Sequence, residues 1–124
     1  MKEIKKINIE IASNYCFYST DKSVIFWIVS NSIDKSKNNL KELINKLQSS
    51  FDLKVLDKSE DTITFQRPDG SFFILTSKST NQNIRNFQEV NIAGAFIFEE
   101  IKDNYLNEII SRSLFSDLKV FYVL

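Results

Sequence analysis

The sequence predicts an α+β protein with a single mixed β-sheet of about six to eight strands and two helices packed on it. The predicted order of elements is β-β-β-α-β-β-β-β-α-β. Three observations lead to this prediction: a continuous apolar run at residues 24–29, a helical face between residues 34 and 49, and a series of short alternating runs in residues 51–76. Both helices are expected to lie against the sheet.

The first elements are expected to be strands. Within residues 4–11 the segment INIEI alternates isoleucine with Asn8 and Glu10, which is typical of a strand with one face in water. Residues 15–18 are predicted to form a second short strand. The run VIFWIV at residues 24–29 is apolar throughout and rich in β-branched and aromatic residues. Such a run favours a strand covered on both faces, so we place it at the centre of the sheet.

A helix is predicted over about residues 34–49, with Ser32 or Asp34 as its N-cap. Its apolar residues fall at the spacing i, i+3, i+4, i+7, which forms one helical face: Leu40, Leu43, Ile44 and Leu47. The alternating runs of residues 51–76 then predict a three-stranded meander. Its second turn, from Arg67 to Gly70, has Pro68 to fix the first central φ and Gly70 to supply a positive φ.

Residues 78–88 are the most polar segment and are expected to form a loop, which includes Arg85. A buried strand at residues 95–98 follows, and it ends in two adjacent carboxylates, Glu99 and Glu100. A second helix is expected to be capped by Asp103. The run LKVFYV at residues 118–123 predicts a final strand.

The composition sets limits on the class of protein. The 124 residues favour one domain, residues 1–124, and 43% are apolar and 26% charged, as in ordinary folded proteins. No apolar run approaches the roughly 18 to 20 residues of a membrane span. The charged start, MKEIKKINIE, has no hydrophobic signal region, so we expect a cytoplasmic protein that does not bind a membrane.

The side-chain inventory disfavours several kinds of site. Lys plus Arg and Asp plus Glu both number 16, which argues against nucleic-acid binding. There is no His, so the usual general base near neutral pH is missing. The single cysteine, Cys16, lies in an apolar run and is expected to be a buried, inert thiol. Two glycines, Gly70 and Gly94, cannot supply a GxGxxG or GxxxxGK[ST] phosphate loop. We therefore expect no catalytic residues, no metal and no cofactor.

Glu99 and Glu100 are the first candidates for a chemical site, because ligands of open α/β sheets usually lie beyond the carboxyl ends of the strands. Arg85, together with Arg67, is a candidate for binding an anion. The structural alternative is that the two glutamates begin the second helix, where carboxylates favour the positive end of the dipole. For the arginines, the alternative is exposure to solvent or a surface ion pair. Trp27 is expected to lie in the core.

The segments VIFWIVSNS, DGSFFILTS, NIRNFQ, GAFIFEE, SRSL and KVFYVL occur in an order that resembles the ATPase core of viral DNA-packaging terminase large subunits. The resemblance covers roughly residues 24–124. In that family a strand ends in two adjacent acidic residues, of which one holds magnesium and the other activates the attacking water. The resemblance implies these roles for Glu99 and Glu100. The family also needs a P-loop, for which residues 18–23 have no glycine, so ATP hydrolysis is not expected.

The sequence leaves three functions open. The first is a small non-enzymatic module that binds another protein, such as a toxin-immunity protein or a phage-type inhibitor of a host enzyme. The second is a degenerate nucleotide-binding domain of the terminase type. The third is a structural or assembly module that forms homo-oligomers through exposed strand edges. The lack of a catalytic constellation and the mixed surface charge favour the first.

Overall fold

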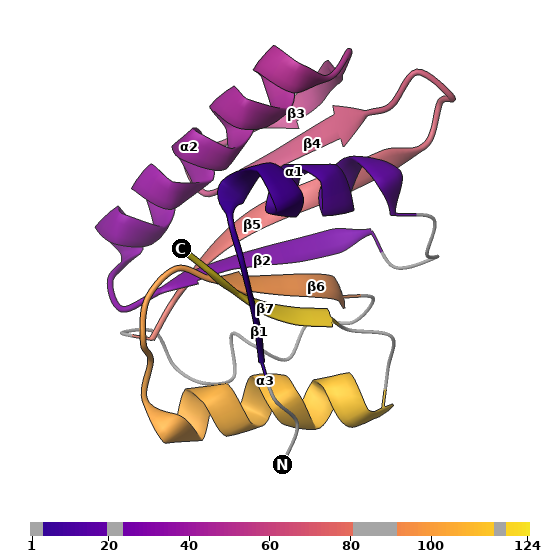
Figure 1. Ribbon diagram of the computed structural model, residues 1–124. Coiled ribbons are helices and arrows are strands. Elements are labelled where there is room, and N and C mark those ends of the chain that lie inside the picture. The colour runs from indigo at the N-terminus through magenta and orange to yellow at the C-terminus, as the bar shows by residue number, and fades with distance from the viewer. Residues whose placement is uncertain (1–3, 20–23, 81–91, 116–118) are drawn as a thin grey trace.

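The structure is a computed structural model, which describes residues 4–19, 24–80, 92–115 and 119–124 (Figure 1). Seven strands and three helices occur in these ranges. In chain order they are β1 (Lys5–Ile7), α1 (Ile9–Tyr18), β2 (Ile25–Ser30), α2 (Ile33–Ser50), β3 (Lys54–Lys58), β4 (Thr62–Gln66), β5 (Phe72–Ser79), β6 (Ile92–Ile97), α3 (Asp103–Phe115) and β7 (Lys119–Val123).

The strands form one mixed sheet in the order β1-β7-β6-β2-β5-β4-β3. Every neighbouring pair from β1 to β5 is parallel, and the β5–β4 and β4–β3 pairs are antiparallel. The predicted mixed sheet, its α+β class and the three-stranded meander are therefore confirmed. β2 is the middle strand, as its continuous apolar run predicts.

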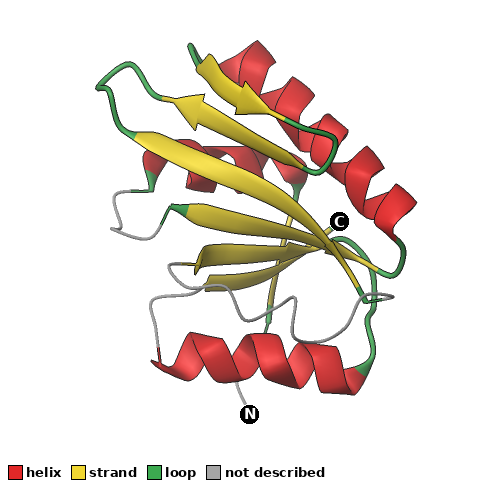
Figure 2. Cartoon of the chain, turned by 180° about the vertical axis from the view of Figure 1, so that it is seen from behind, coloured by secondary structure: helices red, strands yellow, loops and turns green. Residues whose placement is uncertain are grey.

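The sheet separates two hydrophobic cores, one on each face. Figures 1 and 2 show the helices that lie on the two faces. α1 and α2 cover one face, and α3 covers the other. Alternate residues of β2 supply both cores: Phe26 packs in the cluster that contains the buried residues of α1 and α2, and Trp27 packs in the cluster that contains Ile109 of α3. Both aromatic side chains are fully buried. A strand buried on both faces has no polar side to show, which explains the unbroken apolar run.

The prediction for the first 18 residues is wrong in part. β1 covers only Lys5–Ile7, and the expected strand of residues 15–18 belongs to α1, a third helix. Asn8 begins α1, because its side-chain Oδ1 accepts a hydrogen bond of 2.9 Å from the Ile11 backbone N–H. The residues of α1 that face the sheet include the small side chains Ala12 and Cys16. Such side chains let the helix lie close to the sheet and give no clear helical pattern of large apolar residues. The described chain thus has three helices, where the sequence predicted two.

α2 begins one residue before the predicted helix and ends one residue after it. The Ser32 side chain caps it by accepting a hydrogen bond of 3.2 Å from the Lys35 N–H. The next strand, β3, starts at Lys54 and forms the outer edge of the sheet next to β4. Its pairing with β4 shifts register between Val55 and Asp57, which marks a β-bulge.

The turn between β4 and β5 agrees with its prediction. The Gly70 N–H donates a hydrogen bond of 3.0 Å to the Arg67 carbonyl, and Gly70 has a φ of 90°. β5 is longer than expected and runs to Ser79, so the predicted loop of residues 78–88 begins too early. Arg85 lies outside the described residues. Within the described part of the chain, no helix is long and apolar enough to cross a membrane.

Candidate functional site

The five parallel strands end along one edge of the sheet, which we call the carboxyl edge. It is formed by the residues that follow β1, β7, β6, β2 and β5. Glu99 and Glu100 lie here, in the segment between the end of β6 at Ile97 and the start of α3 at Asp103. The prediction that the two acids follow the end of a buried strand is therefore correct. The alternative that they begin the helix is wrong.

The Glu99 carboxylate joins two loops of the carboxyl edge. Its Oε1 accepts a hydrogen bond of 2.7 Å from the Asn31 backbone N–H, which follows β2. Its Oε2 lies 3.3 Å from the Lys35 Nζ in the first turn of α2. The Asn31 side chain returns the contact by donating from Nδ2 to the Glu100 carbonyl at 3.1 Å. Glu99 thus fastens the loop after β6 to the loop after β2.

Glu100 is exposed and lines two open cavities at the carboxyl edge. The first, of about 340 Å³, is also lined by Lys6, Glu99 and Tyr122. The second, of about 410 Å³, is also lined by Asn31 and Thr80. Burial raises the pKa of Tyr122, and the negative charges of Glu100 and Asp103 raise it further. Both glutamates line the first cavity, and Glu100 lines the second as well.

The described strand-to-helix junctions at this edge contain no glycine-rich phosphate cradle. A P-loop is a glycine-rich segment between a strand and the helix that follows it, and its backbone N–H groups hold the phosphates. In the described chain, strand passes to helix at Asn8, at Asn31–Ser32 and at Phe98–Lys102, and none of these junctions contains a glycine. At the junction after β1, a single residue separates strand from helix. The backbone there has no length with which to wrap a phosphate.

Within the part of the chain that the structure describes, the two acids do not form a metal site with other side chains. Among residues 4–19, 24–80, 92–115 and 119–124, no group of three acidic or sulfur side chains is close enough to hold a metal ion. Glu99 accepts a backbone hydrogen bond and an ion pair, so both of its oxygens are in use. Glu100 is exposed, and within the described ranges it belongs to no group of three such side chains.

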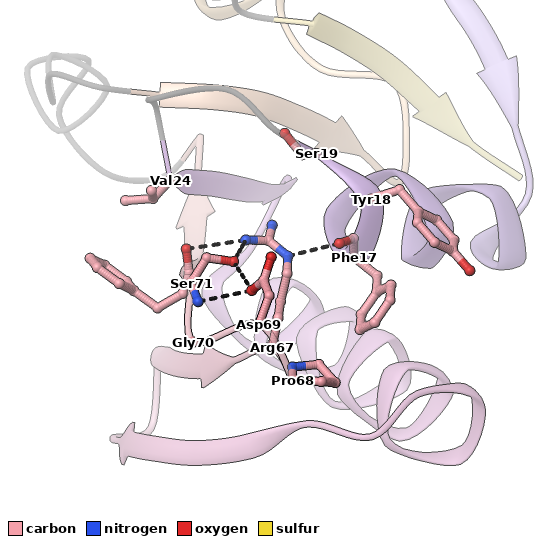
Figure 3. A pocket seen from close by; sticks show the side chains of 10 residues that line it. Phe17, Tyr18, Ser19, Val24, Arg67, Pro68, Asp69, Gly70 and Ser71 are labelled. Carbon is pink, nitrogen blue, oxygen red and sulfur yellow. Dashed lines mark hydrogen bonds between the residues drawn. The ribbon is translucent and has the colours of Figure 1, made fainter.

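A larger cavity lies at the opposite edge of the sheet, between the end of α1 and the β4–β5 turn (Figure 3). We call it the turn cavity; its volume is about 780 Å³, and its lining residues are Phe17, Tyr18, Ser19, Val24, Arg67, Pro68, Asp69, Gly70, Ser71 and Phe72. Two of its aromatic side chains are notably exposed, Tyr18 at 67% and Phe72 at 45%. Aromatic residues and arginine, which are enriched at protein interfaces, both occur in this lining.

Arg67 joins the two walls of the turn cavity, and its predicted role as an anion ligand is not what the geometry favours. Its Nε donates to the Phe17 carbonyl and its Nη2 to the Cys16 carbonyl, both at 2.7 Å. Its Nη1 donates to Ser71 Oγ at 3.1 Å (Figure 3). Partial burial lowers the pKa of the Arg67 guanidinium, and the nearby Asp69 carboxylate opposes this. The side chain caps the C-terminus of α1, where cations are favourable.

Cys16 is fully buried, in accordance with its prediction. Burial raises the pKa of its thiol well above the usual range, and the Arg67 charge only partly offsets this. The turn cavity itself was not predicted, because the sequence suggested a strand where α1 lies. The available signal was the polar residue Asn8 followed by Ala12 and Cys16 at helical spacing, with Ile11 and Tyr18 on another face.

The comparisons with known proteins agree on the fold. One solved structure of the large terminase from a thermophilic bacteriophage matches 91% of this chain with a TM-score of 0.73 and 16% sequence identity. Another structure of that terminase, in complex with ADP, matches 97% of the chain with a TM-score of 0.72 and 17% identity.

This chain spans 29% and 32% of those two terminase chains. No protein-family model and no curated protein sequence matches it. The resemblance predicted from the order of the segments is thus confirmed at the level of fold: the chain has a terminase-like fold.

Proposed function

We propose that this chain is a non-hydrolysing protein on a terminase-like fold that acts by binding another protein. The observation that carries this proposal is the junction between β1 and α1. A P-loop is a glycine-rich segment between a strand and a helix, and this junction consists of Asn8 alone, whose side chain is used to cap α1. Without that segment, neither positioning nor charge neutralisation of a triphosphate is available.

The turn cavity is the surface that we assign to the partner. Tyr18 and Phe72 expose aromatic area beside the rigid Arg67 clamp, and tyrosine is enriched among the residues that dominate interface energies. Two roles fit a small protein that acts by binding another protein: a toxin-immunity protein and an inhibitor of a host enzyme. In either role the chain would act as one domain in the cytoplasm of a bacterium or an infected cell.

Capture from an extract of the native host tests this proposal. The immobilised chain should retain a specific protein, and a Tyr18→Ser, Phe72→Ser variant should lose it. The matched control is Leu124→Ser, which removes an apolar side chain that is 83% exposed and lies outside the turn cavity. Equal retention by the double variant and the wild type would show that the turn cavity is not the binding surface. No retained protein in any arm would argue against the proposed class.

A degenerate nucleotide-binding domain is the second candidate. The cavity beside Lys6, Glu100 and Tyr122 favours it, since it lies at the edge where ligands of such sheets bind. A ligand at 100 times its dissociation constant stabilises a fold by about 2.7 kcal/mol. For a chain of this size the melting temperature would rise on the order of 10 °C. A thermal melt with millimolar magnesium-ATP, and another with magnesium-ADP, separates the two functions.

We expect no shift with either nucleotide, and no change in that result for the Glu99→Gln, Glu100→Gln variant. A clear rise in the melting temperature that disappears in this variant would replace the first proposal with the second. The melt and the capture experiment are independent, so each function can fail by itself.

A further inference from the structure

The outer edge of the sheet is open at β3. Among the described strands its one neighbour is β4, and all five of its residues are exposed. Val55 and Leu56 are 40% and 47% exposed. The backbone groups of β3 that face away from β4 therefore have no described strand beside them. An exposed edge of this kind is a template for pairing with another strand.

The bulge in β3 places two opposite charges on one face. Lys54 pairs with Gln66 and Asp57 pairs with Thr64. Residues directly opposite each other in an antiparallel pair share a face, and Gln66 and Thr64, two positions apart, share one as well. Lys54 and Asp57 consequently lie on the same face, although residues three apart in a regular strand lie on opposite faces. The extra residue at the register shift causes this.

We propose that two copies of this chain pair through their β3 strands, antiparallel about a two-fold axis, with Lys54 of each copy opposite Asp57 of the other. A two-fold axis normal to the sheet requires that paired residues occupy the same face in both copies. In a regular strand this condition forces the axis through a residue such as Leu56, which would set Lys54 against Lys58. The bulge permits the other register for the two charged residues, because Lys54 and Asp57 share a face. Val55 and Leu56 then lie next to the axis.

The charge pattern favours a second copy over a different partner. Lys54, Val55, Leu56 and Asp57 read positive, apolar, apolar, negative, and the antiparallel copy presents the complement of each. Within the described part of the chain, neither Lys54 nor Asp57 belongs to an ion pair. Lysine on an edge strand normally discourages pairing, because like charges meet. In this register Lys54 meets a carboxylate and Lys58 lies opposite Leu53, so no two lysines face each other. The net charge of zero adds no long-range repulsion.

Charge reversal with rescue in a mixture tests the register. Sedimentation of the wild type from about 10 μM to about 1 mM should show a dimer that grows with concentration. Lys54→Glu and Asp57→Lys each replace two attractive contacts with two repulsive ones, so each variant should dimerise at least about tenfold more weakly. An equimolar mixture of the two variants restores both opposite-charge contacts and should form a heterodimer.

Lys58→Glu is the matched control, since it reverses a lysine of the same strand that would lie opposite Leu53 of the second copy. It should leave the dissociation constant within about threefold of the wild-type value. A wild type that stays monomeric, a Lys54→Glu variant that dimerises normally, or a mixture that stays monomeric would each overturn the proposal. Circular dichroism confirms that the exposed substitutions leave the fold intact. Partner capture by Lys54→Glu should be unchanged, because β3 does not line the turn cavity.

Discussion

The Glu99 carboxylate and the Asn31 backbone N–H, 68 positions apart in the chain, are joined by a hydrogen bond of 2.7 Å. This contact fastens the loops that follow β6 and β2 at the carboxyl edge. It is less exposed to solvent than the ion pair between Glu99 and Lys35 beside it. The Lys35 side chain is 62% exposed and that of Glu99 only 28%, so the backbone hydrogen bond is the more sheltered contact.

Glu99→Ala should lower the free energy of unfolding by about 1 to 2 kcal/mol, because the Asn31 N–H loses a charged acceptor. Lys35→Ala should cost about 0.5 kcal/mol or less, as is usual for exposed ion pairs. Urea denaturation followed by circular dichroism measures both values. Glu100→Ala is the control, since its side chain is exposed and should change stability little. Equal losses for Glu99→Ala and Glu100→Ala would contradict the structural role of Glu99.

Arg67→Lys should destabilise the protein nearly as much as Arg67→Met. The Arg67 guanidinium reaches the Cys16 and Phe17 carbonyls from two different nitrogens, and a single ammonium group does not reproduce that fork. We expect a loss of about 1 to 3 kcal/mol in either variant. Hydrogen exchange at the last turn of α1 should quicken in both. Restoration by lysine of wild-type protection would show that charge alone, and not the geometry of the donors, holds α1.

Gly70→Ala should lower the free energy of unfolding by about 1 kcal/mol or more. An added Cβ would meet no atom within 4 Å, so the expected cost comes from the φ of 90° and not from a clash. Gly70→Asn should lose less, since asparagine tolerates positive φ better than alanine. Thermal melts rank the three proteins. An alanine variant as stable as the wild type would mean that this turn is relaxed in solution.

Trp27→Ala should leave a molten or insoluble protein. The side chain is fully buried in the middle strand, and its truncation costs about 3 to 5 kcal/mol, a large share of a typical folding stability. Loss of the near-ultraviolet circular dichroism signal and binding of a hydrophobic dye would report this state. Trp27→Phe, which keeps most of the apolar volume, is the milder companion. Cooperative unfolding of the alanine variant near the wild-type midpoint would contradict the central role of β2 in the core.

Local patterns were sufficient for elements whose side chains obey one period. The apolar run around Trp27, the heptad-like spacing around Leu43 and the turn at Gly70 each predicted the observed structure, because burial and φ act on neighbouring residues. Two alternating residues misled the prediction at the N-terminus. Ile9 and Ile11 fit a strand, but Ile11 is 49% exposed on α1. The residues of α1 that face the core are small, so they form no stripe of large apolar side chains.

The candidate site was predicted only as far as position along the chain allows. An apolar strand that ends in Glu99 and Glu100 indicated the carboxyl edge correctly. The hydrogen bond to the Glu99 carboxylate comes from the backbone of Asn31, which lies in a distant part of the sequence. The role of Arg67 likewise depends on the end of α1, 50 positions earlier. Contacts of this range follow from strand order, which no local period encodes.

The place of β7 in the sheet has a consequence for the time course of folding. β7 lies between β1 and β6, and β1 has no other neighbour among the described strands. The Leu124 N–H also donates to the Ile7 carbonyl, at 2.9 Å. β1, although it is made before β7 on the ribosome, therefore waits for that later segment before it can join the sheet. Such distant parallel pairing slows folding, and until β7 is inserted the nascent chain leaves the side of β6 open to aggregation.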